Sequence, residues 1–222
     1  MGALISVSGV DGSGKSTQID RLARALRARG RSPRVFWHRP GYSAELDALR
    51  SLVRRVRPNS LPTAAAPERR AKAFANPRTQ LVWFCAAVAD MALQYGIKVR
   101  VWRLFGQDVI CDRYLSDAQV DLRLRFPAVA DRFGSAFSLL SLACPRPDLA
   151  VLLLVPDTVA DARLSQKNEP FPDDLEVRAA RRRSYESLGA TGEFVVVDAS
   201  EDIERVTARI VAAAEQAVDG RS

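Results

Sequence analysis

The chain has 222 residues, of which 47% are hydrophobic, and it carries a formal net charge of +7. This length suffices for one full-sized core, and the apolar fraction excludes general disorder. The longest apolar runs fall short of the roughly 20 residues that a membrane crossing needs, so no membrane partner is expected. The three cysteines are widely spaced and match no metal-ligand pattern, and no secretory signal is recognisable. We therefore expect a single cytoplasmic domain over 1–222.

Apolar runs of strand length alternate with helical patterns along the chain. In chain order we expect a strand at 3–8, a helix at 16–29, a strand at 33–38, a turn and helix at 39–56, a mobile loop at about 58–77, a helix at 78–105, a strand at 108–112, helices within 115–143, a strand at 148–155, a helix at 158–166, a helix ending near 189, a strand at 194–199 and a helix at 202–218. Continuous runs of Val, Ile and Leu separated by helices are typical of a parallel sheet covered on both faces. The expected fold is therefore an α/β three-layer sandwich with a five-stranded parallel sheet.

The stretch "GVDGSGKST" follows the first expected strand and leads into the first expected helix. It satisfies G-x-x-x-x-G-K-[ST], the phosphate-binding loop of many nucleotide-binding proteins. Its backbone N–H groups are suited to hold phosphate oxygens, its lysine to contact the β- and γ-phosphates, and its serine to ligate Mg²⁺. We expect ATP with Mg²⁺ to bind at Gly9, Asp11, Gly12, Ser13, Gly14, Lys15, Ser16 and Thr17. The structural alternative is a plain glycine turn, in which a lysine at the helix N-terminus has little structural use without an anion.

Arginine clusters account for the positive charge, for example at 181–183. Such clusters attract phosphorylated small molecules or nucleic acid, although a solvated surface explains them equally well. His38 is the only histidine, so histidine-based triads have no support. Phosphoryl transfer does not need one, because it relies mainly on positioning and on charge neutralisation.

Five short stretches occur in the order and rough spacing of one known family: "GVDGSGKSTQ", "HRPG", "VICDRY", "RPDL" and "VVVDAS". The chain thereby resembles the thymidylate kinase family, a group of P-loop nucleoside monophosphate kinases. The resemblance spans nearly the whole chain. It implies an ATP- and Mg²⁺-dependent kinase that transfers the γ-phosphoryl to a small acceptor, and family members are often dimers joined through helices.

The resemblance also assigns roles to individual residues. Asp11 corresponds to the carboxylate that faces the acceptor's sugar hydroxyl, and Arg39 to an arginine that steadies the acceptor phosphate. Asp112 is expected near Mg²⁺, at the end of its strand. Arg113 is expected to hold an acceptor oxygen, which suits its planar fork, and Tyr114 to shape the pocket wall. Lys15, Asp11, Asp112 and Arg113 are thus the expected catalytic residues, with Lys167 added by the segment described next.

A lid is expected at about 164–174. Gly12 stands where one class of the family has an arginine in the loop, so another cation is needed for the transition state. Arg163 corresponds to the arginine that packs against adenine, and Lys167 is placed to reach the transferring phosphoryl. An ordinary polar helix end is the alternative for Lys167.

The acceptor side departs from the family pattern. The family has a phenylalanine that stacks on the base and, four residues later, an arginine that hydrogen-bonds it; here these positions are Phe84 and Val88. Valine cannot donate that hydrogen bond, and Phe84 can equally be a core residue. After "DRY" the chain reads "LSDAQVDLR", in which Asp117 and Asp121 are candidates for binding acceptor hydroxyls. A charged surface helix is the alternative explanation for both.

Three hypotheses remain open at this point. The first is a kinase for a nucleoside monophosphate such as dTMP, or for a related nucleoside- or sugar-like molecule. The second is a kinase that acts on a nucleic-acid end or a modified base, although nucleic acid is not the favoured partner. The third is a regulatory protein that binds ATP without transferring a phosphoryl group. A homodimer through the apolar helix is possible in each case.

Overall fold

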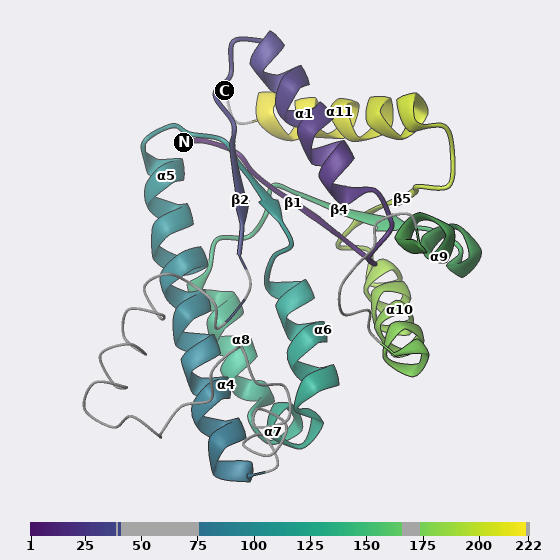
Figure 1. Ribbon diagram of the computed structural model, residues 1–222. Coiled ribbons are helices and arrows are strands. Elements are labelled where there is room, and N and C mark those ends of the chain that lie inside the picture. The colour runs from purple at the N-terminus through teal and green to yellow at the C-terminus, as the bar shows by residue number, and fades with distance from the viewer. Residues whose placement is uncertain (39, 41–75, 166–173, 221–222) are drawn as a thin grey trace.

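The computed structural model describes residues 1–38, 40, 76–165 and 174–220, and these form a parallel α/β sheet with helices on both faces (Figure 1). The strands are β1 (Leu4–Gly9), β2 (Arg34–Trp37), β3 (Val109–Asp112), β4 (Leu149–Leu154) and β5 (Val195–Asp198). They pair in the order β2-β3-β1-β4-β5, and every pairing is parallel. The predicted three-layer fold is confirmed; the single-domain prediction stays a prediction.

The helices divide between the two faces and the end of the sheet. Their bounds are α1 (Lys15–Ala28), α4 (Pro77–Met91), η1 (Ala92–Val99), α5 (Arg100–Leu104), α6 (Leu115–Arg125), α7 (Pro127–Arg132), α8 (Gly134–Ala143), α9 (Asp157–Ser165), α10 (Leu175–Gly189) and α11 (Ile203–Asp219). Helices α1 and α11 lie together on one face, and the continuous run α4–η1–α5 lies with α6 and α8 on the other (Figure 1). The predicted elements within the described ranges are therefore present.

Alternate strand residues supply the two cores because successive side chains point to opposite faces. In β1, Ile5 packs with α1 and α11, whereas its neighbour Leu4 packs with the continuous run α4–η1–α5 and with α6. In β3, Ile110 joins the first core while Val109 and Cys111 join the second. The sheet is thus apolar on both faces, which is why its strands read as unbroken hydrophobic runs.

The run Pro77–Leu104 forms one continuous helix whose middle, η1, has π-helical geometry. Asn76 caps its start by accepting a hydrogen bond from the N–H of Arg78, and Pro77 occupies the first turn. π-Helical segments are rare and often occur at functional sites. Here the segment contains Tyr95, whose ring is fully buried beside His38 and Tyr114.

This same helix is long and apolar enough, by length and composition, to cross a membrane, and 39% of its most apolar window is buried inside the protein. Phe84, Met91, Tyr95 and Val99 are at most 1% exposed in the second core. One face of the helix therefore packs in the second core, which accounts for the apolar residues on that face.

The predicted helix at 39–56 and the predicted mobile loop at 58–77 fall almost entirely outside the described residues. Of the predicted lid at 164–174, only Leu164, Ser165 and Asp174 are described. The described residues include the carboxyl ends of the parallel strands, where ligands bind in sheets of this type.

Candidate active site

The phosphate-binding loop joins β1 to α1 at the centre of the sheet. The strand ends at Gly9 and the helix begins at Lys15, with Gly14 as its N-cap in a left-handed conformation (φ 88°). No side chain caps this helix start. The first N–H groups of α1 therefore point into the loop without a capping side chain, and together with the helix dipole they suit an anion such as phosphate.

Gly12 is required by the way helix α9 crosses the loop. Its φ is 81°, and a Cβ at this position would lie 2.7 Å from the carbonyl oxygen of Ala160 in α9. Real Cβ atoms essentially never approach an oxygen so closely, so a larger residue here would have to displace α9. The loop of this chain consequently has no room for the arginine that one class of the family carries at this position.

Lys15 folds back over the loop. Its Nζ donates to the carbonyl oxygens of Gly9 (2.9 Å) and Val10 (2.8 Å), and lies 3.8 Å from a carboxylate oxygen of Asp11. Burial, and secondarily the nearby charge of Arg113, lowers the pKa of the Lys15 ammonium to about 8. A buried cation that donates to neutral carbonyls, with its nearest described carboxylate 3.8 Å away, is suited to receive a polyanion.

Two oxygen donors at the loop fit a magnesium ion. Ser16 is exposed in the first turn of α1, and Asp112 ends the adjacent strand β3. The Oδ1 of Asp112 is buried and has no hydrogen-bond partner among the described residues. Burial is the main reason that the pKa of this carboxyl is raised, because it disfavours the charged form. A bound cation would stabilise that charged form. Hydroxyl and carboxylate oxygens are the ligands that Mg²⁺ prefers, so these residues fit the ion.

Arg113 follows Asp112 and has a strained backbone. Among the described residues it is the only non-glycine residue with a positive φ (73°), and its N–H donates to the carbonyl oxygen of Val7 (3.0 Å). Such a conformation costs about 1–3 kcal/mol and persists only where the surroundings impose it, often at functional sites. Its consequence here is to turn the side chain back over the end of β1.

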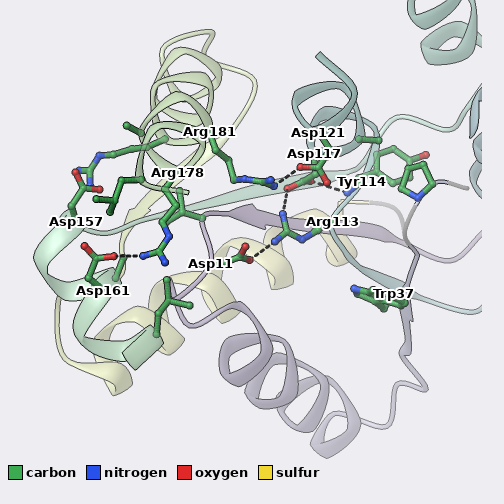
Figure 2. A pocket seen from close by; sticks show the side chains of 18 of the residues that line it. Asp11, Trp37, Arg113, Tyr114, Asp117, Asp121, Asp157, Asp161, Arg178 and Arg181 are labelled. Carbon is green, nitrogen blue, oxygen red and sulfur yellow. Dashed lines mark hydrogen bonds and ion pairs between the residues drawn. The ribbon is translucent and has the colours of Figure 1, made fainter. Parts of the chain in front are cut away.

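The guanidinium of Arg113 is held between two groups. Its Nη2 donates to Asp11 (2.5 Å), and its Nη1 donates to the hydroxyl of Tyr185 (3.0 Å). Burial opposes the charged form, but Tyr185, Asp117 and Asp11 outweigh it, so the pKa of Arg113 lies above its usual value. The structure thus brings the predicted residues Asp11 and Arg113 into direct contact (Figure 2).

Asp117 is buried and fully hydrogen-bonded rather than exposed on a helix surface. One oxygen accepts from Ser8 Oγ (2.7 Å) and from the N–H of Tyr114 (2.9 Å), and the other accepts from the hydroxyl of Tyr185 (2.6 Å). Only 1% of Asp117 is exposed. Its predicted contact with acceptor hydroxyls stays a prediction, and its observed role is to join β1, the start of α6 and α10.

A cavity of about 900 Å³ opens beside this network (Figure 2). Of the predicted residues, Asp11, Arg113, Tyr114, Asp117 and Asp121 line it. Helix α10 contributes three arginines, each paired with a carboxylate across the cavity wall: Arg178 with Asp161, Arg181 with Asp121, and Arg182 with Asp157. The volume is within the range of small-molecule sites, and the wall offers both signs of charge.

Arg163 projects from α9 onto the phosphate loop. Its Nη1 donates to the carbonyl oxygen of Gly12 (3.3 Å), and its Nη2 donates to that of Ala199 (3.1 Å), just after β5. The predicted packing of Arg163 on adenine stays a prediction, and the observed side chain bridges the loop to the far edge of the sheet. Arg39 and Lys167 lie outside the described residues.

Phe84 and Val88, the predicted base-side positions, pack in the second core. Phe84 is 1% exposed and contacts the rings of Phe133 and Phe137, and Val88 packs against the same cluster. Neither is among the described residues that line the cavity. The core interpretation of Phe84 therefore matches its packing, and its contact with a base stays a prediction.

Several residues of the site escaped the sequence analysis. Trp37, at the end of β2, lines the cavity and is 60% exposed. Its position at a strand's carboxyl end was the available signal. Tyr185 had no local signal, because its partners lie far away in the sequence. Arg181 and Arg182 belong to the cluster at 181–183 that the sequence analysis named, but the sequence did not place that cluster at the site.

A phosphate loop at the central strand of a five-stranded parallel sheet, a buried carboxylate on the neighbouring strand and an arginine directed at a cavity define a P-loop kinase. The family model for thymidylate kinase matches residues 7–210, nearly the whole chain. The chain therefore belongs to the thymidylate kinase family and is a phosphotransferase.

Individual relatives agree with the family match. The thymidylate kinase of Dinoroseobacter shibae is 32% identical over 224 residues, covering 95% of each chain. That of Bifidobacterium longum is 31% identical over 214 residues, covering 94% of this chain and 95% of the relative. That of Pelobacter propionicus is 28% identical over 223 residues, covering 96% and 93%. These full-length matches favour neither a kinase of nucleic-acid ends nor a non-catalytic ATP-binding protein.

Proposed function

We propose that this protein transfers the γ-phosphoryl of ATP to a nucleoside monophosphate, with dTMP as the first candidate, in the cytoplasm. The observation that carries the proposal is the Asp11–Arg113 ion pair, which stands between the phosphate loop and the cavity. In this pair, Asp11 can accept a hydrogen bond from a hydroxyl and the fork of Arg113 can bind a phosphate, both beside the loop that would hold ATP. The full-length similarity to thymidylate kinases supports the choice of acceptor.

In this mechanism the chain mainly positions and neutralises the phosphates. The N–H groups of the loop and of the start of α1 hold the triphosphate, and Lys15 exchanges its two carbonyl partners for phosphate oxygens. Arg113 binds the acceptor phosphate and keeps it in line with the γ-phosphoryl, while Asp11 orients the acceptor. Because the transition state is loose, these fixed charges matter more than a general base.

Magnesium would be held at Ser16 and Asp112. When bound, the ion would offset the negative charge of the phosphates. Asp112 contributes the unpartnered Oδ1 that makes the site acidic, and it is kept in place by the pairing of β3 with β1. Replacing Asp112 with Asn is therefore expected to raise the magnesium concentration that turnover requires and to leave the fold intact.

The experiment is a coupled assay of ADP release with ATP and a panel that contains dTMP, dUMP, the other nucleoside monophosphates and simple sugars. We expect release with one class of nucleoside monophosphate, and a loss of about 100- to 1000-fold in kcat/KM on Arg113→Ala, which removes a charge from the reacting centre. Arg209→Ala is the matched control, because it removes an exposed, ion-paired arginine on α11, remote from the cavity. ATP binding without phosphorylation of any acceptor in the panel would overturn the proposal.

A further inference from the structure

We infer that Tyr185 is the positioning residue that fixes the guanidinium of Arg113 for the acceptor. The inference rests on the proposed function for the role of Arg113, but it starts from a hydrogen-bond network. Tyr185 lies on α10, it is 0% exposed, and its hydroxyl is bonded to two charged groups at once. It donates to Asp117 Oδ1 at 2.6 Å and accepts from Arg113 Nη1 at 3.0 Å.

The direction of both hydrogen bonds follows from the chemistry of the partners. A carboxylate can only accept and a guanidinium can only donate, so the tyrosine proton points to Asp117 and a lone pair faces Arg113. Burial keeps the pKa of Tyr185 well above its usual value, so the hydroxyl stays protonated across the working pH range. The hydroxyl therefore has one orientation, and it offers Arg113 one acceptor in one place.

Asp117 makes this arrangement rigid. Its other oxygen is already occupied by Ser8 Oγ and the N–H of Tyr114, which anchor it to β1 and to the start of α6. Oδ1 of Asp117 also lies 3.8 Å from Arg113 Nη1, so the negative charge of the carboxylate acts directly on the guanidinium as well as through the hydrogen-bonded tyrosine hydroxyl. Asp117 thus fixes Tyr185, and Tyr185 fixes Arg113.

The two partners of the Arg113 fork differ in exposure, which gives them different roles. The side chain of Asp11 is 43% exposed and lines the cavity, so an incoming phosphate can compete with it for Nη2. Tyr185 lies behind the guanidinium and is not among the described cavity-lining residues. Nη1 therefore stays bound to Tyr185 while Nη2 exchanges its partner, and the plane of the fork is preserved.

A neighbouring pair on the same two helices supports the arrangement. One turn before Tyr185, Arg181 of α10 pairs with Asp121, which lies one turn after Asp117 in α6 (Figure 2). The two helices are thus joined by two consecutive polar contacts, of which only the inner one reaches Arg113. This places α10 in a position to influence the acceptor side of the site.

The test is a double-mutant cycle between Tyr185→Phe and Arg113→Ala. The phenylalanine keeps the ring packing and removes only the hydroxyl. We expect Tyr185→Phe to lower kcat/KM for the acceptor by roughly 10- to 100-fold, as expected when a reacting group is misplaced, with KM for ATP changed less than about 2-fold. In the Arg113→Ala background the same change should alter kcat/KM less than about 2-fold, because its effect passes through Arg113. Ser184→Ala, which deletes another hydroxyl of α10, is the control and should behave as the parent protein.

A second measurement does not depend on any acceptor. The Nε–Hε signal of Arg113 in a ¹⁵N–¹H spectrum, assigned by its loss in Arg113→Lys, should shift or broaden in Tyr185→Phe and stay unchanged in Ser184→Ala. If the parent protein phosphorylates nothing but this signal responds as expected, the proposed function fails and the positioning role stands. If Tyr185→Phe does not fold, Asp117→Asn takes its place with the same expected outcomes. Three results would each overturn the inference: additive effects in the cycle, equal increases in KM for ATP and for the acceptor in Tyr185→Phe, or an unchanged Arg113 signal.

Discussion

Trp37 stands at the cavity with 60% of its surface exposed, an uncommon state for a tryptophan. With Phe84 buried in the core, Trp37 is the large exposed ring among the cavity residues that we describe. A base stacked on an aromatic ring gains about 1–3 kcal/mol. We expect Trp37→Ala to raise KM for the acceptor about 10-fold, and Trp37→Phe to raise it less. Steady-state kinetics with either substrate varied would check this, and an unchanged acceptor KM would contradict it. The KM for ATP serves as the internal control.

Gly12 gives a second prediction at the scale of a single residue. Gly12→Ala places a Cβ 2.7 Å from the Ala160 carbonyl oxygen, whereas Gly192→Ala, at a similar φ of 78°, meets nothing within 4 Å. Both substitutions carry the cost of a left-handed alanine, about 1 kcal/mol, but only the first also strains the contact with α9. Chemical denaturation and ATP titration should therefore show a larger loss of stability and of ATP affinity for Gly12→Ala. Equal losses in the two variants would mean that α9 yields without cost.

At the scale of the elements, Asp108, the residue directly before β3, connects several parts of the fold. Its carboxylate accepts from the N–H of Ala3 (2.8 Å) and receives both Nε and Nη2 of Arg31 (2.7 Å each). Burial alone would raise the pKa of Asp108, but the hydrogen bonds from Arg31 and Ala3 outweigh it, and the pKa is lowered. This carboxylate therefore joins the beginnings of β1 and β3 to the end of α1.

The sign of the linked stability follows from that lowered pKa. The contribution of Asp108 is fully present above the unfolded-state pKa of about 4 and is lost as the pH falls through the lower folded-state value. We expect Asp108→Asn to reduce the free energy of unfolding by about 2 kcal/mol at pH 7, allowing for the partly exposed Arg31. The difference from the parent protein should shrink as the pH falls below about 4. Asp20→Asn, which breaks an exposed pair with Arg24, is the control and should cost well under 1 kcal/mol. A pH-independent difference would contradict this explanation.

The elements were largely predictable, and the contacts between them were not. The phosphate loop was predictable from its own pattern between a strand and a helix. The resemblance to thymidylate kinases indicated the β3 carboxylate and Arg113, and their position at a strand end agreed with those roles. Tyr185 could not be found this way because its partners, Arg113 and Asp117, belong to another part of the sequence. Asp117 was predicted to bind an acceptor hydroxyl or to lie on a charged helix surface, because the pattern alone cannot show that Ser8 of β1 and Tyr185 of α10 enclose it. The π-helical geometry of η1 was equally hidden, because its apolar spacing suits an α-helix.

At the scale of the whole molecule, one apolar face has no partner within the described chain. The exposed large apolar side chains of the long helix and of α8 are Val82, Leu93, Ile97, Val101, Leu104, Leu139 and Leu142, and Phe105 follows the end of the long helix. The two elements are packed against each other, and exposed large apolar side chains such as these are common at interfaces. We expect two copies of the chain to pair through this face, as the helix-mediated dimers of the family imply.

Sedimentation velocity should therefore report a dimer at micromolar concentration. Ile97→Glu places a charge in the middle of the face and should yield a monomer with the same far-UV spectrum. Ile203→Glu, at an exposed position in the first turn of α11, is the control and should remain dimeric. A monomeric parent protein would contradict the expectation.

The strand order also has a consequence for how the protein is made. The central strand β1 leaves the ribosome before the other four strands of the sheet, yet Leu4 pairs with Val109 and Ile5 pairs with Leu149. Until about two thirds of the chain has been synthesised, the most deeply buried strand has no neighbour on at least one side. A nascent chain of this protein thus carries an unpaired apolar segment for several seconds, at elongation rates of about 5–20 residues per second. Its yield in a cell should depend on what shields that segment during translation, even though the finished sheet encloses it completely.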